Sequence, residues 1–197
     1  MTCQTSLDSI RYTTMDDNFG ATSQWLERLF ALHRNLMRQF ANEEGLQLVH
    51  VEILQYLSVC NRYSDTTQAI SEYLGQTKGS ISQSVGNLEE NGFVKKVQDK
   101  VDKRIFHLSL TTKGSSVVKR MSKFIDLDGS DTVAPELKVL LTTIQKKHGF
   151  RGFGVCISCK FNENAGQNNF VCGLTKEKLS FQDIQKICKE HEDQAAS

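Results

Sequence analysis

The sequence predicts a mainly α-helical protein with one small β-hairpin and a distinct C-terminal segment. Apolar residues recur at helical spacing through most of the first three quarters of the chain. Two short alternating runs near the middle predict the hairpin. Four of the six cysteines lie close to the C-terminus, in a stretch with little aliphatic content. A chain of 197 residues can form one ordinary domain and such an extension.

Two apolar stripes predict the first two helices. The first stripe consists of Trp25, Leu29, Leu32, Leu36 and Phe40. The sequence ANEEG, with Gly45 at its end, stops that helix. The second stripe consists of Leu48, Val51, Ile53, Leu54 and Leu57. The polar sequence NRYSD, residues 61–65, then predicts a loop.

A pair of short helices is expected next. The first covers residues 66–74, and Gly75 with Gln76 makes a tight turn after it. The second covers residues 77–92, and its buried face is defined by apolar residues spaced four and three apart. Those residues are Ile81, Val85 and Leu88.

The hairpin follows at once. Residues 93–98 and 105–110 form the two strands, and the polar loop DKVDKR lies between them. Helix, turn, helix and two-stranded hairpin is the order of a winged helix-turn-helix. The fold class is therefore mainly α with a small β-hairpin wing, a helical dimerisation region and a Cys-rich end.

Two further helices and the cysteine segment complete the chain. TTKG, residues 111–114, opens one helix, and Pro135 lies in the first turn of another that runs to residue 148. A last helix is expected over LSFQDIQKICKEH, with Ser180 and Asp183 as a capping pair. The predicted divisions are an arm (1–18), a dimerisation helix (19–45), the winged helix-turn-helix (46–114), dimerisation helices (115–149) and the cysteine segment (150–197).

Three sequence motifs in the winged-helix region resemble those of the MarR family of transcription regulators. They are GLQLVHVEIL (45–54), TQAISEYLGQTKGSISQSVGNLEENGFVKK (67–96) and DKVDKRIFHLSLTTKG (99–114). The third is the most specific, since it holds the family's Asp-x-Arg at Asp102 and Arg104 and its Leu-Thr-x-x-Gly ending at Gly114. The resemblance implies a homodimeric, DNA-binding regulator, with repression as the expected sign, rather than an enzyme. Two winged domains would then face successive major grooves about 34–36 Å apart on a palindromic operator.

The exposed face of the helix over 77–92 supplies the candidate base-reading side chains. Gln83 and Asn87 can each pair two-pronged with an adenine edge. The remaining candidates there, suited to phosphates or to either base, are Lys78, Ser80 and Ser84. Many MarR relatives carry arginine at the position of Gln83. Because this chain has glutamine there, its helix lacks an arginine that could pair with a guanine base.

Basic residues at the hairpin tip supply a second DNA contact. Arg104 is expected to enter the minor groove with Asp102 holding its guanidinium, and an A·T-rich groove suits an arginine there. Lys100 and Lys103 add positive charge. A solvated hairpin tip is the alternative interpretation of the same residues.

The four C-terminal cysteines predict a metal centre. They are Cys156, Cys159, Cys172 and Cys188. A segment with so little core usually needs a covalent or metal crosslink, and four thiolates can provide one. The single Cys-x-x-Cys pair fits an iron–sulfur cluster slightly better than a zinc ribbon, although zinc is the commonest structural metal for four thiolates. A redox disulfide between Cys156 and Cys159, unlinked thiols, and a catalytic pair of Cys188 with His191 remain alternatives.

The predicted function combines these two parts. We expect a cytoplasmic regulator, since no apolar leader or membrane-spanning run is visible. The net charge of +1 means that any attraction to DNA must be local. Its metal centre, attached at the dimerisation end, would report redox or iron status. One alternative is a MarR-type regulator that binds a small aromatic ligand near Trp25, Phe30, Tyr56 and Tyr73 and holds a structural zinc. Another is a redox enzyme or electron carrier that has kept a winged-helix scaffold for contacts with other proteins.

Overall fold

The computed structural model describes residues 20–126, 130–150, 152–164, 166 and 169–194. The predicted arm, residues 1–18, lies outside the described residues. The chain forms two compact units, residues 1–36 and 37–197. In the first unit, the described part is the start of helix α1, where Trp25, Leu29, Phe30 and Leu32 are exposed.

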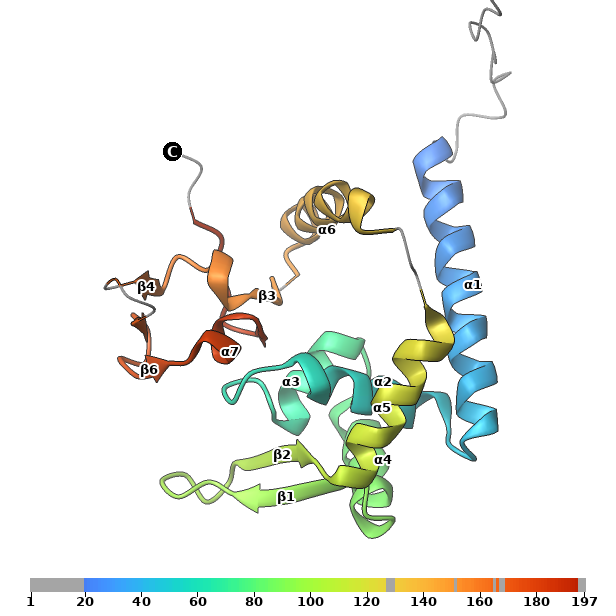
Figure 1. The fold of residues 1–197 in the computed structure, drawn as a ribbon, viewed down its shortest axis with the longest axis horizontal. Coiled ribbons are helices and arrows are strands. Elements are labelled where there is room, and N and C mark those ends of the chain that lie inside the picture. The colour runs from blue at the N-terminus through green and yellow to red at the C-terminus, as the bar shows by residue number, and fades with distance from the viewer. Residues whose placement is uncertain (1–19, 127–129, 151, 165, 167–168, 195–197) are drawn as a thin grey trace, which may run out of the picture. The chain divides into compact units, whose positions relative to one another are not determined.

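The helices and the wing follow the predicted order (Figure 1). Their bounds are α1 Ala21–Glu43, α2 Leu48–Val59, α3 Thr67–Leu74, α4 Lys78–Glu90, β1 Val94–Gln98, β2 Phe106–Leu110, α5 Thr112–Ile125, the 3-10 turn η1 Ser130–Val133 and α6 Ala134–His148. Strands β1 and β2 pair antiparallel, with Val94 opposite Leu110 and Gln98 opposite Phe106.

One apolar core holds the winged helix together. It is built from α2, α3, α4 and α5 with the last turns of α1, and its fully buried members include Ile53, Leu54, Ile70, Ile81 and Leu88. The turn between α3 and α4 is tight because Gly75 adopts a left-handed conformation with φ of 64°, which favours glycine. Thr66 and Thr77 cap the two helices through their side-chain oxygens.

The cysteine segment is a set of short strands and turns. Its elements are β3 Gly154–Val155, η2 Cys156–Ser158, β4 Asn162–Asn164, β5 Phe170–Cys172, β6 Lys178–Leu179, α7 Phe181–Ile184 and β7 Ile187–Cys188. Strands β4, β5 and β6 form one antiparallel sheet, and β3 pairs with β7. A small core contains Cys156, Phe170, Leu179 and Ile184.

The predicted last helix is wrong in its second half. The capping pair of Ser180 and Asp183 is present, but α7 ends at Ile184. Beyond it, Ile187 and Cys188 are extended because their backbones pair with β3, and Ile187 O also accepts from Asn61 N at 2.9 Å. Long-range pairing therefore overrides the local helical pattern.

The structure also explains why the Leu-Thr-x-x-Gly motif ends in glycine. Thr111 caps α5 by accepting from Gly114 N, and its hydroxyl donates to Gly92 O at 2.7 Å. A Cβ atom on Gly114 would lie 2.2 Å from Phe93 O. Only glycine therefore lets α5 start so close to the wing.

We expect Gly114→Ala to lower the free energy of unfolding by about 1–3 kcal/mol, because the added methyl group overpacks a backbone contact. Urea unfolding followed by circular dichroism measures it. Gly86→Ala is the matched control, since open space surrounds that helical glycine. The control should gain roughly 0.5–1 kcal/mol. A Gly114→Ala protein as stable as the unaltered one would contradict this account.

Candidate DNA-binding surface and cysteine site

Helix α4 presents the predicted polar face. Ile81, Val85 and Leu88 are buried, as expected from their spacing. The opposite face is exposed and carries Lys78, Ser80, Gln83 and Asn87. These four side chains are therefore free to contact a ligand as large as a DNA groove.

Ser84 does not belong to that face. Its side chain is buried, and its hydroxyl donates to Ser80 O at 3.0 Å. It lies three residues after Ile81 and four before Leu88, so helical spacing places it on the buried face with them. Ser84 is therefore not positioned for the DNA contact that the sequence predicted.

The wing tip, residues 99–104, holds Arg104 in a defined orientation. Asp102 accepts from Arg104 Nε at 3.0 Å and from Arg104 Nη2 at 2.9 Å. These hydrogen bonds lower the pKa of Asp102, so the carboxylate stays charged. The Arg104 side chain remains 90% exposed, and Lys100 and Lys103 are also exposed. The predicted pairing of Asp102 with Arg104 is confirmed.

Sequence reasoning missed the role of His107 in β2. Its Nδ1 lies 2.6 Å from Asp65 Oδ1, and its Nε2 lies 3.2 Å from Asp99 Oδ2. Protonated imidazole can donate to both carboxylates. The hydrogen bond with Asp65 raises the pKa of His107, whereas burial raises the pKa of Asp65 despite that bond. Alternation placed His107 in a strand but could not show two carboxylates facing it.

This bridge predicts a pH dependence of stability. Because the folded pKa of His107 lies above its unfolded value of about 6.5, its contribution is complete below that pH and is lost as pH rises through the folded pKa. We expect the stability difference between the unaltered protein and His107→Gln to shrink between about pH 6.5 and the higher folded value. Urea unfolding at several pH values measures it, and a constant difference would contradict it.

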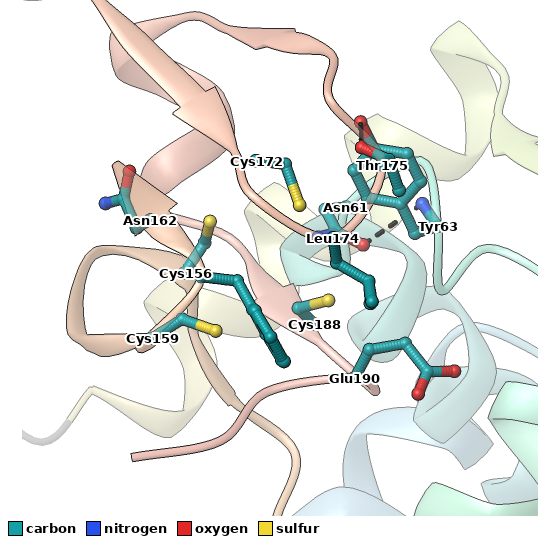
Figure 2. A pocket seen from close by; sticks show the side chains of 11 residues that line it. Asn61, Tyr63, Cys156, Cys159, Asn162, Cys172, Leu174, Thr175, Cys188 and Glu190 are labelled. Carbon is teal, nitrogen blue, oxygen red and sulfur yellow. Dashed lines mark hydrogen bonds between the residues drawn. The ribbon is translucent and has the colours of Figure 1, made fainter. Parts of the chain in front are cut away.

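The four C-terminal cysteines line one cavity. Figure 2 shows the sulfur atoms of Cys156, Cys159, Cys172 and Cys188 arranged around a common space, with Leu174 beside it. The cavity has a volume of about 30 Å³, and Asn61 and Tyr63 from the loop after α2 also line it. Residues far apart in the sequence are thus brought together.

These cysteines are free thiols in the structure. Within the described part of the chain, no three or more His, Cys, Asp or Glu side chains are grouped so that they could hold a metal ion. Burial, followed by the proximity of the other three thiols, raises the pKa of Cys156 to about 11. The donor set fits a thiolate-binding metal, but the thiols would have to draw closer to ligate one.

Cys60 and His191 differ from the four cavity cysteines. Cys60 is buried at the end of α2, and burial raises its pKa to about 12, as expected of an inert thiol. His191 is buried, and its Nε2 lies 3.0 Å from Ser158 Oγ. Cys188 lies in a strand, so the expected one-helix arrangement of Cys188 and His191 does not occur.

The cysteine segment contacts the DNA-binding domain. Its partner is the docking loop, residues 60–65, between α2 and α3. Ser64 Oγ accepts from Lys189 N at 2.8 Å, and the Tyr63 hydroxyl donates to Glu177 at 2.5 Å. Arg62 donates to Lys178 O at 2.9 Å. These contacts place the segment beside the loop after α2, a neighbour that the sequence did not predict.

Comparison with known families identifies the winged helix. The MarR family model matches residues 44–105. Residues 44–105 are therefore similar in sequence to proteins of the MarR family, which are transcription regulators rather than enzymes. A search of curated protein sequences found no match.

Solved MarR structures share this fold. A MarR regulator from Methanosarcina mazei Go1 has a TM-score of 0.54 and 18% identity, over 64% of this chain and 97% of that one. CouR from Rhodococcus jostii RHA1, bound to p-coumaroyl-CoA, has a TM-score of 0.53 and 19% identity, over 63% and 91%. NadR in complex with 4-hydroxyphenylacetate has a TM-score of 0.52 and 15% identity, over 68% and 96%. These similarities confirm the predicted fold class.

Among the described residues, no helix combines the length and the apolar character that a membrane crossing requires.

Proposed function

We propose that this protein is a sequence-specific DNA-binding transcription regulator that acts as a homodimer, with repression as the expected sign. The observation that carries the proposal is the combination of an exposed polar face on α4 with an arginine held by Asp102 at the wing tip. The family match supports it. Exposed apolar residues on α1 and α6, such as Trp25, Leu29, Val139 and Leu141, supply surface for a dimer.

Selection of duplexes from a randomised DNA library by the full-length protein tests this proposal. We expect a palindromic sequence whose half-sites lie about one helical turn apart. Gln83→Ala should then weaken discrimination at one adenine by about 1–3 kcal/mol. Failure to enrich any sequence, by protein shown to be folded and dimeric, would reject the function.

We further propose that Cys156, Cys159, Cys172 and Cys188 hold a metal centre whose redox or iron status sets DNA affinity. Their convergence on one cavity supports the proposal. An iron–sulfur cluster remains slightly favoured over zinc, for the reason of cysteine spacing given above. Binding would draw the four thiols together and displace their protons.

Anaerobic purification distinguishes the two metals. A brown sample that absorbs in the visible and contains iron and sulfide indicates a cluster, whereas a colourless sample with stoichiometric zinc indicates a structural or regulatory zinc. Metal-free and metal-loaded protein should then differ several-fold in affinity for the selected duplex. Equal affinities would leave the metal with a structural role only.

A second candidate is regulation by a small aromatic ligand, with a purely structural zinc. A groove of about 1050 Å³ is lined by Tyr73 and Phe153 together with apolar residues of α6, including Leu141 and Ile144. Proteins of similar fold bind p-coumaroyl-CoA and 4-hydroxyphenylacetate. Tyr56 is less available, since its buried hydroxyl donates to Ser64 O at 2.7 Å. Release of DNA by phenolic acids, without any response to oxidants, would favour this candidate.

A further inference from the structure

The docking loop is fastened to the strand that carries Cys188. Asn61 N donates to Ile187 O at 2.9 Å, and Lys189 N donates to Ser64 Oγ at 2.8 Å. On its other side the same strand is held next to Cys156, whose N donates to Lys186 O at 3.0 Å. Residues 186–189 therefore connect the cysteine cavity with the docking loop through hydrogen bonds.

The docking loop is also fastened to the wing. Asp65 O accepts from Leu108 N at 2.8 Å, and Asp65 Oδ1 lies 2.6 Å from His107 Nδ1. The other ring nitrogen of His107 faces Asp99 across 3.2 Å. The imidazole thus lies between one carboxylate on the docking loop and another at the wing tip.

Asp99 in turn orders the wing tip. Its Oδ1 accepts from Val101 N and from Asp102 N, each at 2.7 Å. Asp102 then holds Arg104. Together with the backbone of residues 186–187 and 61–65, these contacts connect Cys156 to the guanidinium of Arg104 within residues 37–197.

We infer that the cysteine segment controls the order of its own chain's wing through the docking loop and His107. This inference rests on the proposed function, in which the segment is the sensing part. His107 is a positioning residue, because it would act on DNA through Asp99, Asp102 and Arg104. Displacement of residues 186–189 would release Ser64 and Asp65, and the wing tip would lose the hydrogen bonds that hold Arg104.

The charges around His107 support this arrangement. The groups that face it are Asp65 and Asp99. The positive charge of Lys186, from the cysteine segment, acts on Asp65 and partly offsets the rise in the pKa of Asp65 that burial causes. Two carboxylates favour the doubly donating imidazolium. Lys186 is thus a second connection between the segment and the bridge, in addition to the hydrogen bonds of Ile187 and Lys189.

A double-mutant cycle measures the connection directly. Ser64→Ala removes the acceptor for Lys189 N, and His107→Gln prevents one side chain from reaching both carboxylates. Hydrogen exchange of the wing peptide, residues 97–105, reports the amides that Asp99 protects. We expect each single variant to raise the exchange rate of these amides several-fold. If the two residues act through one connection, the exchange rate in the double variant should be only slightly higher than in the faster single variant.

Ser58→Ala is the matched control, because Ser58 donates only within α2, to Gln55 O. It should leave wing exchange unchanged. Asp65→Asn, which keeps the side-chain size, replaces His107→Gln if that variant does not fold. The inference would be overturned if Ser64→Ala left the exchange rate of the wing unchanged. It would also be overturned if Ser64→Ala raised that rate by the same factor with His107 present and with His107 replaced by Gln.

DNA binding by the same proteins separates this inference from the proposed function. Both the inference and the proposed function are supported if Ser64→Ala lowers the affinity for the selected duplex several-fold, and if the same substitution has no further effect once His107 is replaced by Gln. A wing response in a protein that binds no DNA would support the connection and reject the function. Normal DNA binding that ignores Ser64→Ala would reject the connection and keep the function.

Discussion

Replacing Cys188 with alanine is expected to remove the proposed metal centre almost completely. Cys188 is buried, lies in β7 and lines the common cavity with the other three cysteines. The binding free energy of a four-ligand structural zinc is on the order of 10 kcal/mol, and loss of one thiolate forfeits much of it. Elemental analysis and visible absorption of anaerobically purified protein measure the metal content. The cysteine segment should also become sensitive to proteolysis, while the winged helix stays folded.

Cys60→Ala is the control for this experiment. Cys60 is as well buried as Cys188 but lies outside the cavity lining. We expect the control to keep its full metal content and to lose only about 1 kcal/mol of stability from the shortened side chain. Full metal occupancy in Cys188→Ala would show that the four-cysteine assignment is wrong. Equal loss of metal in both variants would point to a general folding defect instead.

Replacing Arg104 with alanine should weaken DNA binding by about 1–3 kcal/mol per wing, which is roughly 5- to 150-fold. Arg104 is exposed, and Asp102 holds it by two hydrogen bonds, so it is oriented before DNA arrives. Fluorescence anisotropy with the selected duplex at several salt concentrations measures the loss. The slope of log affinity against log salt should also fall by about one per lost contact.

Arg104→Lys separates charge from geometry. Lysine keeps the positive charge but lacks the planar fork that Asp102 holds. We therefore expect Arg104→Lys to retain the salt slope while recovering only part of the affinity. If both variants bind as tightly as the unaltered protein, the wing tip is a solvated hairpin and α4 alone reads the DNA.

Local patterns were sufficient to predict the winged helix. The spacing of Ile81, Val85 and Leu88 gave the buried face of α4, and alternation gave both wing strands. The pairing of Asp102 with Arg104 came from the family resemblance. The prediction that Ser84 is exposed was wrong because Ser84 lies at the boundary between the polar and apolar faces of α4. The sequence does not determine whether such a residue faces solvent or the core.

Long-range pairing accounts for what the sequence could not show. Cys188 was expected in a helix, but its strand is set by backbone partners on Gly154 and, through Ile187, on Asn61. The bridge at His107 likewise depends on Asp65, 42 residues earlier in the chain. No local period encodes such contacts, so the attachment of the cysteine segment to the docking loop became visible only in the structure.

The docking contacts have a consequence for the response of a dimer, because all of them lie within a single chain. In the proposed function, the cysteine segment of each protomer would act on the wing of that same protomer. A dimer in which only one protomer keeps the docking contacts would then hold only one of its two wings in order.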